Sequence, residues 1–148
     1  MRLYFDLCCL NRPFDDHSHE RIRVESEAIL SMLERCVAGV HQWISSTSLE
    51  EEAARNPDLD RRLAIQDMLA EADEELLVGD LVLKRVQEYR TQGLRGFDAV
   101  YLALAEIAGC DILFTVDDDL IRRARQLKPP LTVKVENPAR WVLLGEQP

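Results

Sequence analysis

The sequence predicts an α/β fold: a single three-layer domain with a mostly parallel central sheet and helices on both faces. Apolar runs of strand length alternate along the chain with longer segments in which apolar residues recur every three or four positions, the period of an amphipathic helix. Alternation of this kind is typical of a parallel sheet covered by helices. A length of 148 residues fits one domain, so we treat residues 1–148 as a single unit.

Five short apolar runs predict the strands. In chain order they are residues 3–5, 41–44, 76–78, 112–114 and 131–135. Helical spacing predicts the longer helices at residues 20–40, 59–71, 80–90, 97–108 and 119–127. The Ala-rich helix at residues 97–108 is apolar on most of its surface, which indicates a central position in the fold.

The shorter connections are predicted from residues with strong local preferences. Residues 11–16 combine Asn, Pro and two Asp residues and are expected to form a loop. Ser48 and Glu51 fit a capping box that starts a short helix. This helix should end before Asn56-Pro57, because a residue that precedes proline avoids the α region.

Composition and charge exclude several classes of protein. Hydrophobic residues make up 47% and charged residues 30%, as in soluble globular domains, and no apolar run approaches the roughly 20 residues that cross a bilayer. The net charge of −9 argues against a general nucleic-acid coat, because non-specific affinity comes from Lys and Arg at phosphates. The chain reaches Asp6 at once, so we expect no signal peptide and a cytoplasmic protein without membrane contacts. The four cysteines include no C-x-x-C pair and are expected to be reduced and buried.

Acidic residues follow the predicted strands and open the predicted helices. Asp6 follows the first strand, the run Glu50-Glu51-Glu52 follows the second, the run Asp117-Asp118-Asp119 follows the fourth, and Asp98 opens the central helix. Because sites in such sheets lie beyond the carboxyl ends of the strands, these acids should gather at one edge. Mg²⁺ prefers oxygen ligands and keeps several waters, so a few carboxylates from separate segments suit it well. Without a cation the same acids would repel one another.

Each acid also has a purely structural interpretation. Asp6 could end a strand at the surface, Asp98 could complement the dipole of its helix, and one of residues 117–119 is expected to be an N-cap. At least two of the three glutamates should be solvated charges on a helix surface. A metal site, however, requires all of these acids to follow strands or start helices, as they do here. We therefore favour the functional interpretation.

Four segments carry a family likeness. They are Leu3-Tyr4-Phe5-Asp6, the acidic helix start after Ile44-Ser45-Ser46, the stretch Gly96-Phe97-Asp98-Ala99-Val100-Tyr101-Leu102-Ala103, and Ile112-Leu113-Phe114-Thr115-Val116-Asp117. Together they resemble the PIN-domain nucleases, which include the toxin subunits of VapBC-type toxin–antitoxin pairs. The resemblance extends from Leu3 to about Val135, and its most specific part runs from Asp98 to Asp117. It implies a PIN-like fold for the chain.

The resemblance implies a set of site residues. Asp6, Asp98 and Asp117 match the metal-binding aspartates of the family. Thr115 matches a hydroxyl position that supports the site, although a Thr at a strand end is equally often a turn residue. Tyr101 stands where many relatives carry His, so we assign it no catalytic role.

The site glutamate that the resemblance implies must be one of the three consecutive ones. Glu52 keeps the offset to Asn56-Pro57 that is associated with relatives carrying a similar Cys-Cys-x-Asn-Arg-Pro segment. Glu51 fits the more general pattern of an acid two residues after an apolar one. We choose Glu52 and keep Glu51 and Glu50 as alternatives.

The resemblance also implies an activity and partners. The expected reaction is hydrolysis of RNA phosphodiester bonds, with Mg²⁺ or Mn²⁺ held by the three aspartates and the glutamate. PIN-domain toxins form homodimers and are blocked by a segment of an antitoxin protein laid across the active edge, so a homodimer and an antitoxin partner are expected here. Near the same edge, Arg12 and Arg95 could meet RNA phosphates or form ordinary surface ion pairs.

A non-catalytic or phospho-acceptor α/β regulatory domain is the main alternative, since it also gathers acids around Mg²⁺ at strand ends. Phospho-acceptor receivers pair acids after the first strand and carry a Lys beyond the last. Here Asp6 is followed by Leu7-Cys8-Cys9, and Lys134 lies within its predicted strand. A haloacid-dehalogenase-like phosphatase would need a second Asp where Cys8 stands. The sequence contains neither G-x-x-x-x-G-K-[ST] nor G-x-S-x-G, which argues against phosphate-loop NTPases and serine hydrolases.

Overall fold

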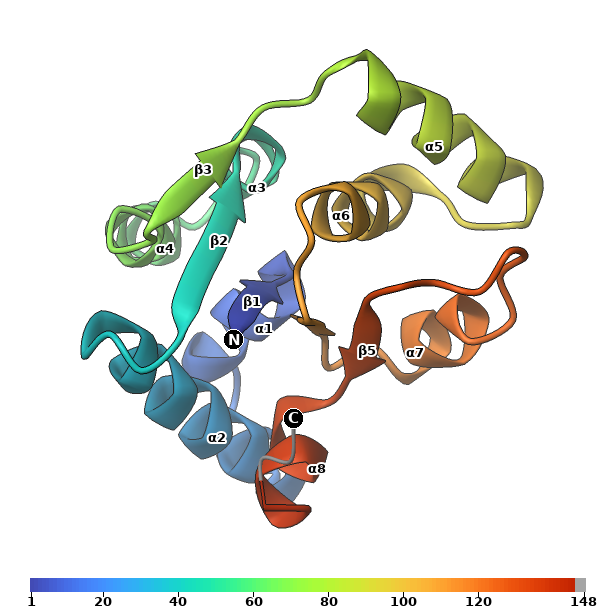
Figure 1. Ribbon diagram of the computed structural model, residues 1–148. Coiled ribbons are helices and arrows are strands. Elements are labelled where there is room, and N and C mark those ends of the chain that lie inside the picture. The colour runs from blue at the N-terminus through green and yellow to red at the C-terminus, as the bar shows by residue number, and fades with distance from the viewer. Residues whose placement is uncertain (146–148) are drawn as a thin grey trace.

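The computed structural model describes residues 1–145 and contains one five-stranded sheet with the strand order β3-β2-β1-β4-β5 (Figure 1). The strands are β1 (Arg2–Phe5), β2 (Gln42–Ser46), β3 (Glu74–Leu76), β4 (Ile112–Phe114) and β5 (Lys134–Glu136). Every neighbouring pair is parallel, and Tyr4 of β1 is aligned with Ile44 of β2 and Leu113 of β4. The carboxyl ends of all five strands therefore lie at one edge.

Helices cover both faces of this sheet. They are α1 (Leu7–Asn11), the 3₁₀ turn η1 (Arg12–Phe14), α2 (Glu20–Val37), α3 (Thr47–Ala54), α4 (Leu59–Leu69), α5 (Asp80–Thr91), α6 (Gly96–Ile107), α7 (Asp118–Ala124) and α8 (Pro138–Leu143). α5 packs against α6 on one face, and α2 packs against α8 on the opposite face (Figure 1). The three-layer α/β fold predicted from the sequence is confirmed.

The core is built on the middle strands. Leu3, Tyr4 and Phe5 of β1 are completely buried, because this strand has neighbours on both sides and helices on both faces. The Phe5 ring stacks on Phe114 of β4, with 5.3 Å between centroids, and meets Trp43 of β2 edge-on at 6.1 Å. Burial of each side chain of this kind stabilises the fold by about 2–3 kcal/mol. The Ala-rich α6 is buried along most of its length, which confirms the central position predicted for it.

The first strand leads directly into helical structure, which continues to Phe14 and so covers most of the loop predicted at residues 11–16. The side chain of Asp6 caps α1 by accepting a hydrogen bond from the backbone N–H of Cys9 at 3.0 Å. Pro13 stands in the first turn of η1, where a helix needs no backbone N–H donor. The expected loop at residues 11–16 is therefore largely wrong. The sequence prediction also has no counterpart to α8, which Asn137 caps through its side chain.

α3 starts earlier than the predicted capping box. Its N-cap is Ser46, whose Oγ accepts a hydrogen bond from the backbone N–H of Leu49 at 3.2 Å. The same Oγ lies 2.7 Å from the hydroxyl oxygen of Tyr4, so the cap is anchored to the middle strand. The capping box of Ser48 and Glu51 is wrong, because the chain is already helical at Thr47.

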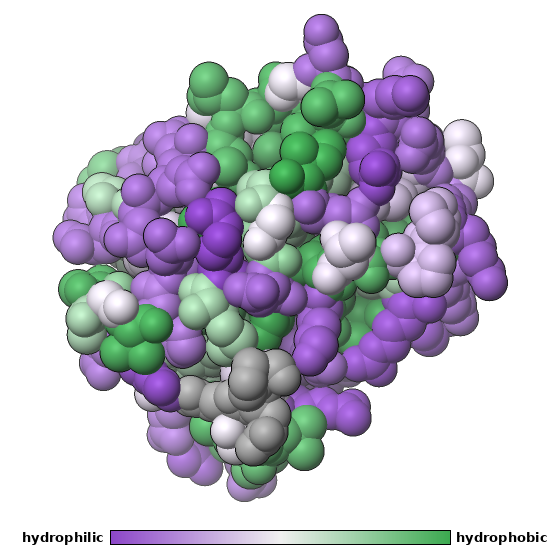
Figure 2. All heavy atoms as spheres, in the orientation of Figure 1, coloured by the Kyte–Doolittle hydropathy of each residue, from purple (hydrophilic) through white to green (hydrophobic). Residues whose placement is uncertain are grey.

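The surface at the start of α5 is apolar. Leu77 and Leu81 are 75% and 72% exposed, and Figure 2 shows apolar side chains gathered over this end of the molecule. Val82, Val86 and Tyr89 form the buried side of α5, whereas Leu81 lies on its exposed side. Within residues 1–145, no helix combines the length and the hydropathy needed to cross a membrane.

Candidate active site

The carboxyl edge of the sheet brings together acids from four segments. Asp6 follows β1, Glu52 lies in α3 after β2, Asp98 lies in the first turn of α6, and Asp117 caps α7 after β4. One cavity of about 230 Å³ is lined by Asp6, Leu7, Cys8, Asn11, Glu52, Asp98, Tyr101 and Asp117. All four acids chosen from the sequence thus meet at one cavity, where a parallel sheet places its sites.

Asp6 is the most buried of the four acids, at 3% exposed. Its Oδ1 accepts hydrogen bonds from the backbone N–H of Cys9 at 3.0 Å and from the Sγ of Cys8 at 2.9 Å. Its own backbone N–H donates to the carbonyl of Phe114 in β4 at 3.0 Å. Burial raises the pKa of Asp6, and hydrogen bonds from Cys8, Thr115 and Cys9 oppose that rise. The carboxyl group is therefore fixed by the protein itself.

Asp117 is held by the start of α7. Its Oδ1 accepts hydrogen bonds from the backbone N–H groups of Asp119 and Leu120 at 2.9 and 3.2 Å. Its own N–H donates to the Oγ1 of Thr115 at 3.1 Å. Thr115 is completely buried, and its Oγ1 also lies 3.2 Å from the Sγ of Cys8. Thr115 therefore connects the acid after β4 with the segment after β1.

Of the three consecutive glutamates, Glu52 is the one at the cavity. Its Oε1 accepts a hydrogen bond from the hydroxyl of Tyr101 at 2.6 Å. Glu51 is exposed and forms an ion pair with Arg55 at 3.0 Å. Glu50 lies toward β3. Its pKa is raised, mainly by burial and then by the negative charge of Glu75 in that strand.

The pKa of Asp98 depends on the other acids of the cavity. Its pKa is raised to about 6, mainly by burial and then by the negative charges of Asp6, Asp117 and Glu52. Carboxylates that raise one another's pKa are close enough to repel, and a bound cation would relieve that repulsion.

The donor set fits a hydrated hard cation. Within residues 1–145, no group of three or more His, Cys, Asp or Glu side chains has the geometry of a metal site. The cavity nevertheless offers carboxylate oxygens and the amide of Asn11, whose buried Oδ1 has no hydrogen-bond partner among the described residues. Mg²⁺ keeps several of its waters, so the four acids can hold it partly through water without all converging on it.

The sequence profile of the PIN domain matches residues 4–126, a range that contains all four acids of the cavity. The chain belongs to the PIN-domain family. PIN domains are generally nucleases. In fold, this PIN domain is similar to a chain of VapBC2 from Rickettsia felis, in the crystal structure of VapBC2 bound to a DNA fragment from their promoter. The TM-score is 0.61 and the sequence identity 11%, with 93% of this chain and 98% of that chain covered. No curated protein sequence matches the chain significantly.

Besides the apolar Leu7, three further residues line the cavity of this PIN domain without having been predicted as site residues. The sequence assigns Cys8 to the apolar interior, Asn11 to a loop, and no catalytic role to Tyr101. Only Tyr101 carries a signal that could have been used: it follows Asp98 by three residues, so the two share one face of α6.

The two candidate RNA-contacting arginines differ in their surroundings. Arg12 is paired with Asp15 at 3.2 Å and with Glu25 at 3.1 Å, so its side chain serves the fold. Arg95 is exposed and lines a second cavity of about 340 Å³, which Asp98 also lines. Arg95 therefore stays a candidate for contacting phosphate beside the acids.

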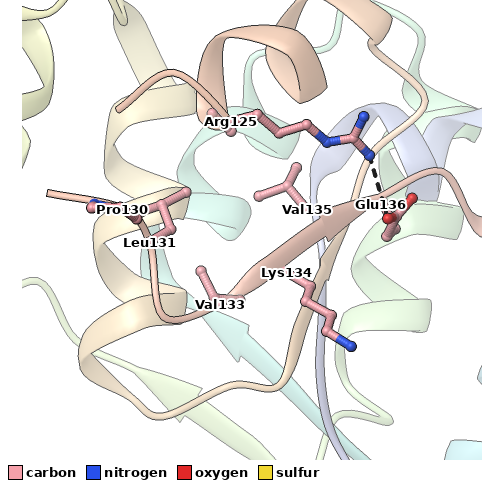
Figure 3. A pocket seen from close by; sticks show the side chains of 8 residues that line it. Arg125, Pro130, Leu131, Val133, Lys134, Val135 and Glu136 are labelled. Atoms are coloured by element: carbon pink, nitrogen blue, oxygen red, sulfur yellow. Dashed lines mark hydrogen bonds and ion pairs between the residues drawn. The ribbon is translucent and has the colours of Figure 1, made fainter. Parts of the chain in front are cut away.

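A separate cavity of about 240 Å³ runs along the edge strand β5 (Figure 3). Its walls include the side chains of Leu131, Val133 and Val135, and Arg125 pairs with Glu136 at 3.3 Å beside them. None of the four acids lines this cavity, so it is distinct from the candidate active site.

Proposed function

We propose that this PIN domain is a divalent-metal-dependent endoribonuclease that hydrolyses RNA phosphodiester bonds. The observation that carries the proposal is the meeting of Asp6, Glu52, Asp98 and Asp117, from four separate segments, at one cavity. The raised pKa of Asp98 supports it, because acids that repel one another favour a cation among them. Membership of a family composed mainly of nucleases supports the class of reaction.

Each acid has a proposed role. Asp6, Asp98 and Asp117 would hold Mg²⁺ or Mn²⁺, directly or through water. When bound, the cation supplies an oriented, more acidic water and stabilises negative charge on the phosphate. Glu52 binds the cation or orients the attacking water, using the carboxylate oxygen that does not accept the hydrogen bond from Tyr101. Because the protein fixes Asp6 and Asp117 by backbone hydrogen bonds, these two carboxylates are oriented in advance.

We also propose two protein partners for this nuclease. An antitoxin segment that offers Arg or Lys would pair with the acids of the cavity and compete with the cation. The fold likeness to a VapBC2 chain supports a toxin role of this kind. A second copy of the chain would cover the exposed Leu77 and Leu81 in a homodimer. The proposed compartment is the cytoplasm, where an RNA substrate and free cysteines are expected together.

Cleavage of single-stranded RNA by purified protein tests the activity. We expect cleavage with Mg²⁺ or Mn²⁺, none with EDTA, and little or none of single-stranded DNA. Glu52→Gln should lose at least about 100-fold in rate. Glu51→Gln is the matched control and should keep the wild-type rate, because Glu51 pairs with Arg55 away from the cavity. Cleavage that persists in EDTA, or equal rates for the two variants, would contradict the proposal.

A further inference from the structure

The ring of Tyr101 is held between aromatic neighbours beside the acid cavity. The residue is 1% exposed, and its ring stacks on Phe97, with 5.8 Å between centroids and 23° between planes. On another side it meets the ring of Tyr4 at 5.8 Å and 45°. Tyr4 is completely buried and is itself anchored to Ser46, the N-cap of α3. The ring of Tyr101 therefore cannot turn without disturbing the core.

These contacts aim the hydroxyl of Tyr101 at Glu52. The O–H donates to Oε1 across 2.6 Å, a length typical of a hydrogen bond to an ionised carboxylate, which is about twice as strong as a neutral one. A glutamate side chain has several rotatable bonds, so a rigid donor restricts it strongly. One carboxylate oxygen is engaged in this way, and the other stays available to a ligand in the cavity.

The same hydrogen bond joins the two helices that carry half of the site. Tyr101 and Asp98 are three residues apart on α6 and share one face, whereas Glu52 belongs to α3. The bond from Tyr101 to Glu52 thus fixes where the carboxylate from α3 stands relative to the carboxylate from α6.

We propose that Tyr101 is a positioning residue that orients Glu52 and thereby sets the affinity of the site for its divalent cation. The inference rests on the proposed function, since it requires a cation at the four acids. Partners that orient metal ligands typically contribute about 10–100-fold to metal affinity. For Tyr101→Phe, which removes only the hydroxyl, we expect roughly a tenfold loss of affinity.

The neighbouring helix α5 contains a matched control. The hydroxyl of Tyr89, a residue 2% exposed, donates to the Oε1 of Glu106 at 2.8 Å and joins α5 to α6 outside the acid cavity. Tyr89→Phe removes the same atom from the same kind of bond. Both variants should lower the free energy of unfolding by about 1–2 kcal/mol, but only Tyr101→Phe should weaken cation binding.

Calorimetric titration of the metal-free protein with Mn²⁺, without RNA, tests the inference. We expect equal affinities for wild type and Tyr89→Phe, and roughly tenfold weaker binding by Tyr101→Phe. In a Glu52→Gln background, Tyr101→Phe should weaken binding no further, because the oriented ligand is already lost. RNA cleavage should require correspondingly more Mg²⁺ in Tyr101→Phe.

The outcomes separate the inference from the proposed function. Wild-type Mn²⁺ affinity in Tyr101→Phe would overturn the inference and leave the nuclease proposal standing, whereas no Mn²⁺ binding by wild type would overturn both. Should Tyr101→Phe not fold, Glu52→Asp tests the same geometry, because its shorter side chain keeps the charge but cannot reach both the Tyr101 hydroxyl and the cation. Undiminished Mn²⁺ binding by Glu52→Asp would then overturn the inference.

Discussion

The Nε of Arg12 lies 3.1 Å from the Oε1 of Glu25, a carboxylate whose side chain is 2% exposed. The pair joins η1 to α2, and Asn137, the N-cap of α8, donates a further hydrogen bond to the same carboxylate. A second positive charge comes from Arg21, whose Nε lies 3.3 Å from the Oε2 of Glu25. The segment after the first strand, whose helix α1 has Asp6 as its N-cap, is thus connected through Glu25 to α2 and α8.

Removal of Arg12 should therefore destabilise the fold. Arg12→Leu leaves the buried Glu25 with fewer partners, and we expect a loss of about 2–4 kcal/mol in the free energy of unfolding, measured in urea. Arg21→Leu is the comparison, because the Arg21 side chain is 54% exposed and its loss should cost at most about 1 kcal/mol. If the two variants lost equal free energy of unfolding, the claim that the more buried arginine contributes more would be contradicted.

Asp98 should make stability depend on pH. Its pKa of about 6 in the folded protein exceeds the usual value near 3.9, so the folded state binds its proton more tightly than the unfolded state does. This contribution to stability is complete below about pH 4 and is lost as the pH rises through 6. In EDTA, Asp98→Asn should be about 1–2 kcal/mol more stable than wild type at pH 8 and equally stable near pH 4. Thermal melts that show no such convergence would rule this out.

Mg²⁺ should stabilise the wild-type protein through the four acids. At a concentration 100 times the dissociation constant, a ligand that binds only the folded state adds about 2.7 kcal/mol. Melting temperatures measured over a Mg²⁺ series should rise for wild type and rise less for Asp98→Asn. Asp60→Asn removes an exposed carboxylate of α4 as a charge control and should follow the wild type. Identical slopes for all three proteins would mean that the acids serve only as helix caps.

The N-cap of α3 should matter more than the residue that the sequence suggested. Ser46→Ala removes the acceptor for the backbone N–H of Leu49 and the partner of the Tyr4 hydroxyl, so we expect a loss of about 1–2 kcal/mol in urea unfolding. Ser48→Ala leaves that cap intact and should have the smaller effect. A larger loss for Ser48→Ala would contradict this prediction and support the capping box of Ser48 and Glu51.

The apolar start of α5 should hold the homodimer. Light scattering at micromolar concentration should give the mass of two chains for wild type and of one chain for Leu81→Lys, because a charge there would have to be buried at the interface. Leu143→Lys changes another strongly exposed leucine, on α8, and should leave the dimer unchanged. A monomeric wild type would refute the homodimer, and dissociation by Leu143→Lys would locate it elsewhere.

Much of the architecture follows from local pattern alone. Burial on one face imposes a period of two on strands and of 3.6 on helices, so the alternation of elements can be read from the sequence without knowing any contact. A parallel sheet then follows, and with it the edge at which Asp6, Asp98 and Asp117 meet. Element ends were less accurate: the third predicted strand begins two residues later than β3, and residues 11–14 are helical.

Tertiary packing distinguishes residues that the local sequence pattern cannot tell apart. Three consecutive glutamates have the same chemistry, and only the contact of α3 with α6 puts Glu52 beside Tyr101 while Glu51 pairs with Arg55. Leu81 satisfies an apolar pattern yet is exposed, because none of residues 1–145 covers its side of α5. The sequence determined the order of the elements and the acids at their ends, since both depend on near neighbours. The partner of each acid depends on segments far apart in the chain, so only the folded structure could decide it.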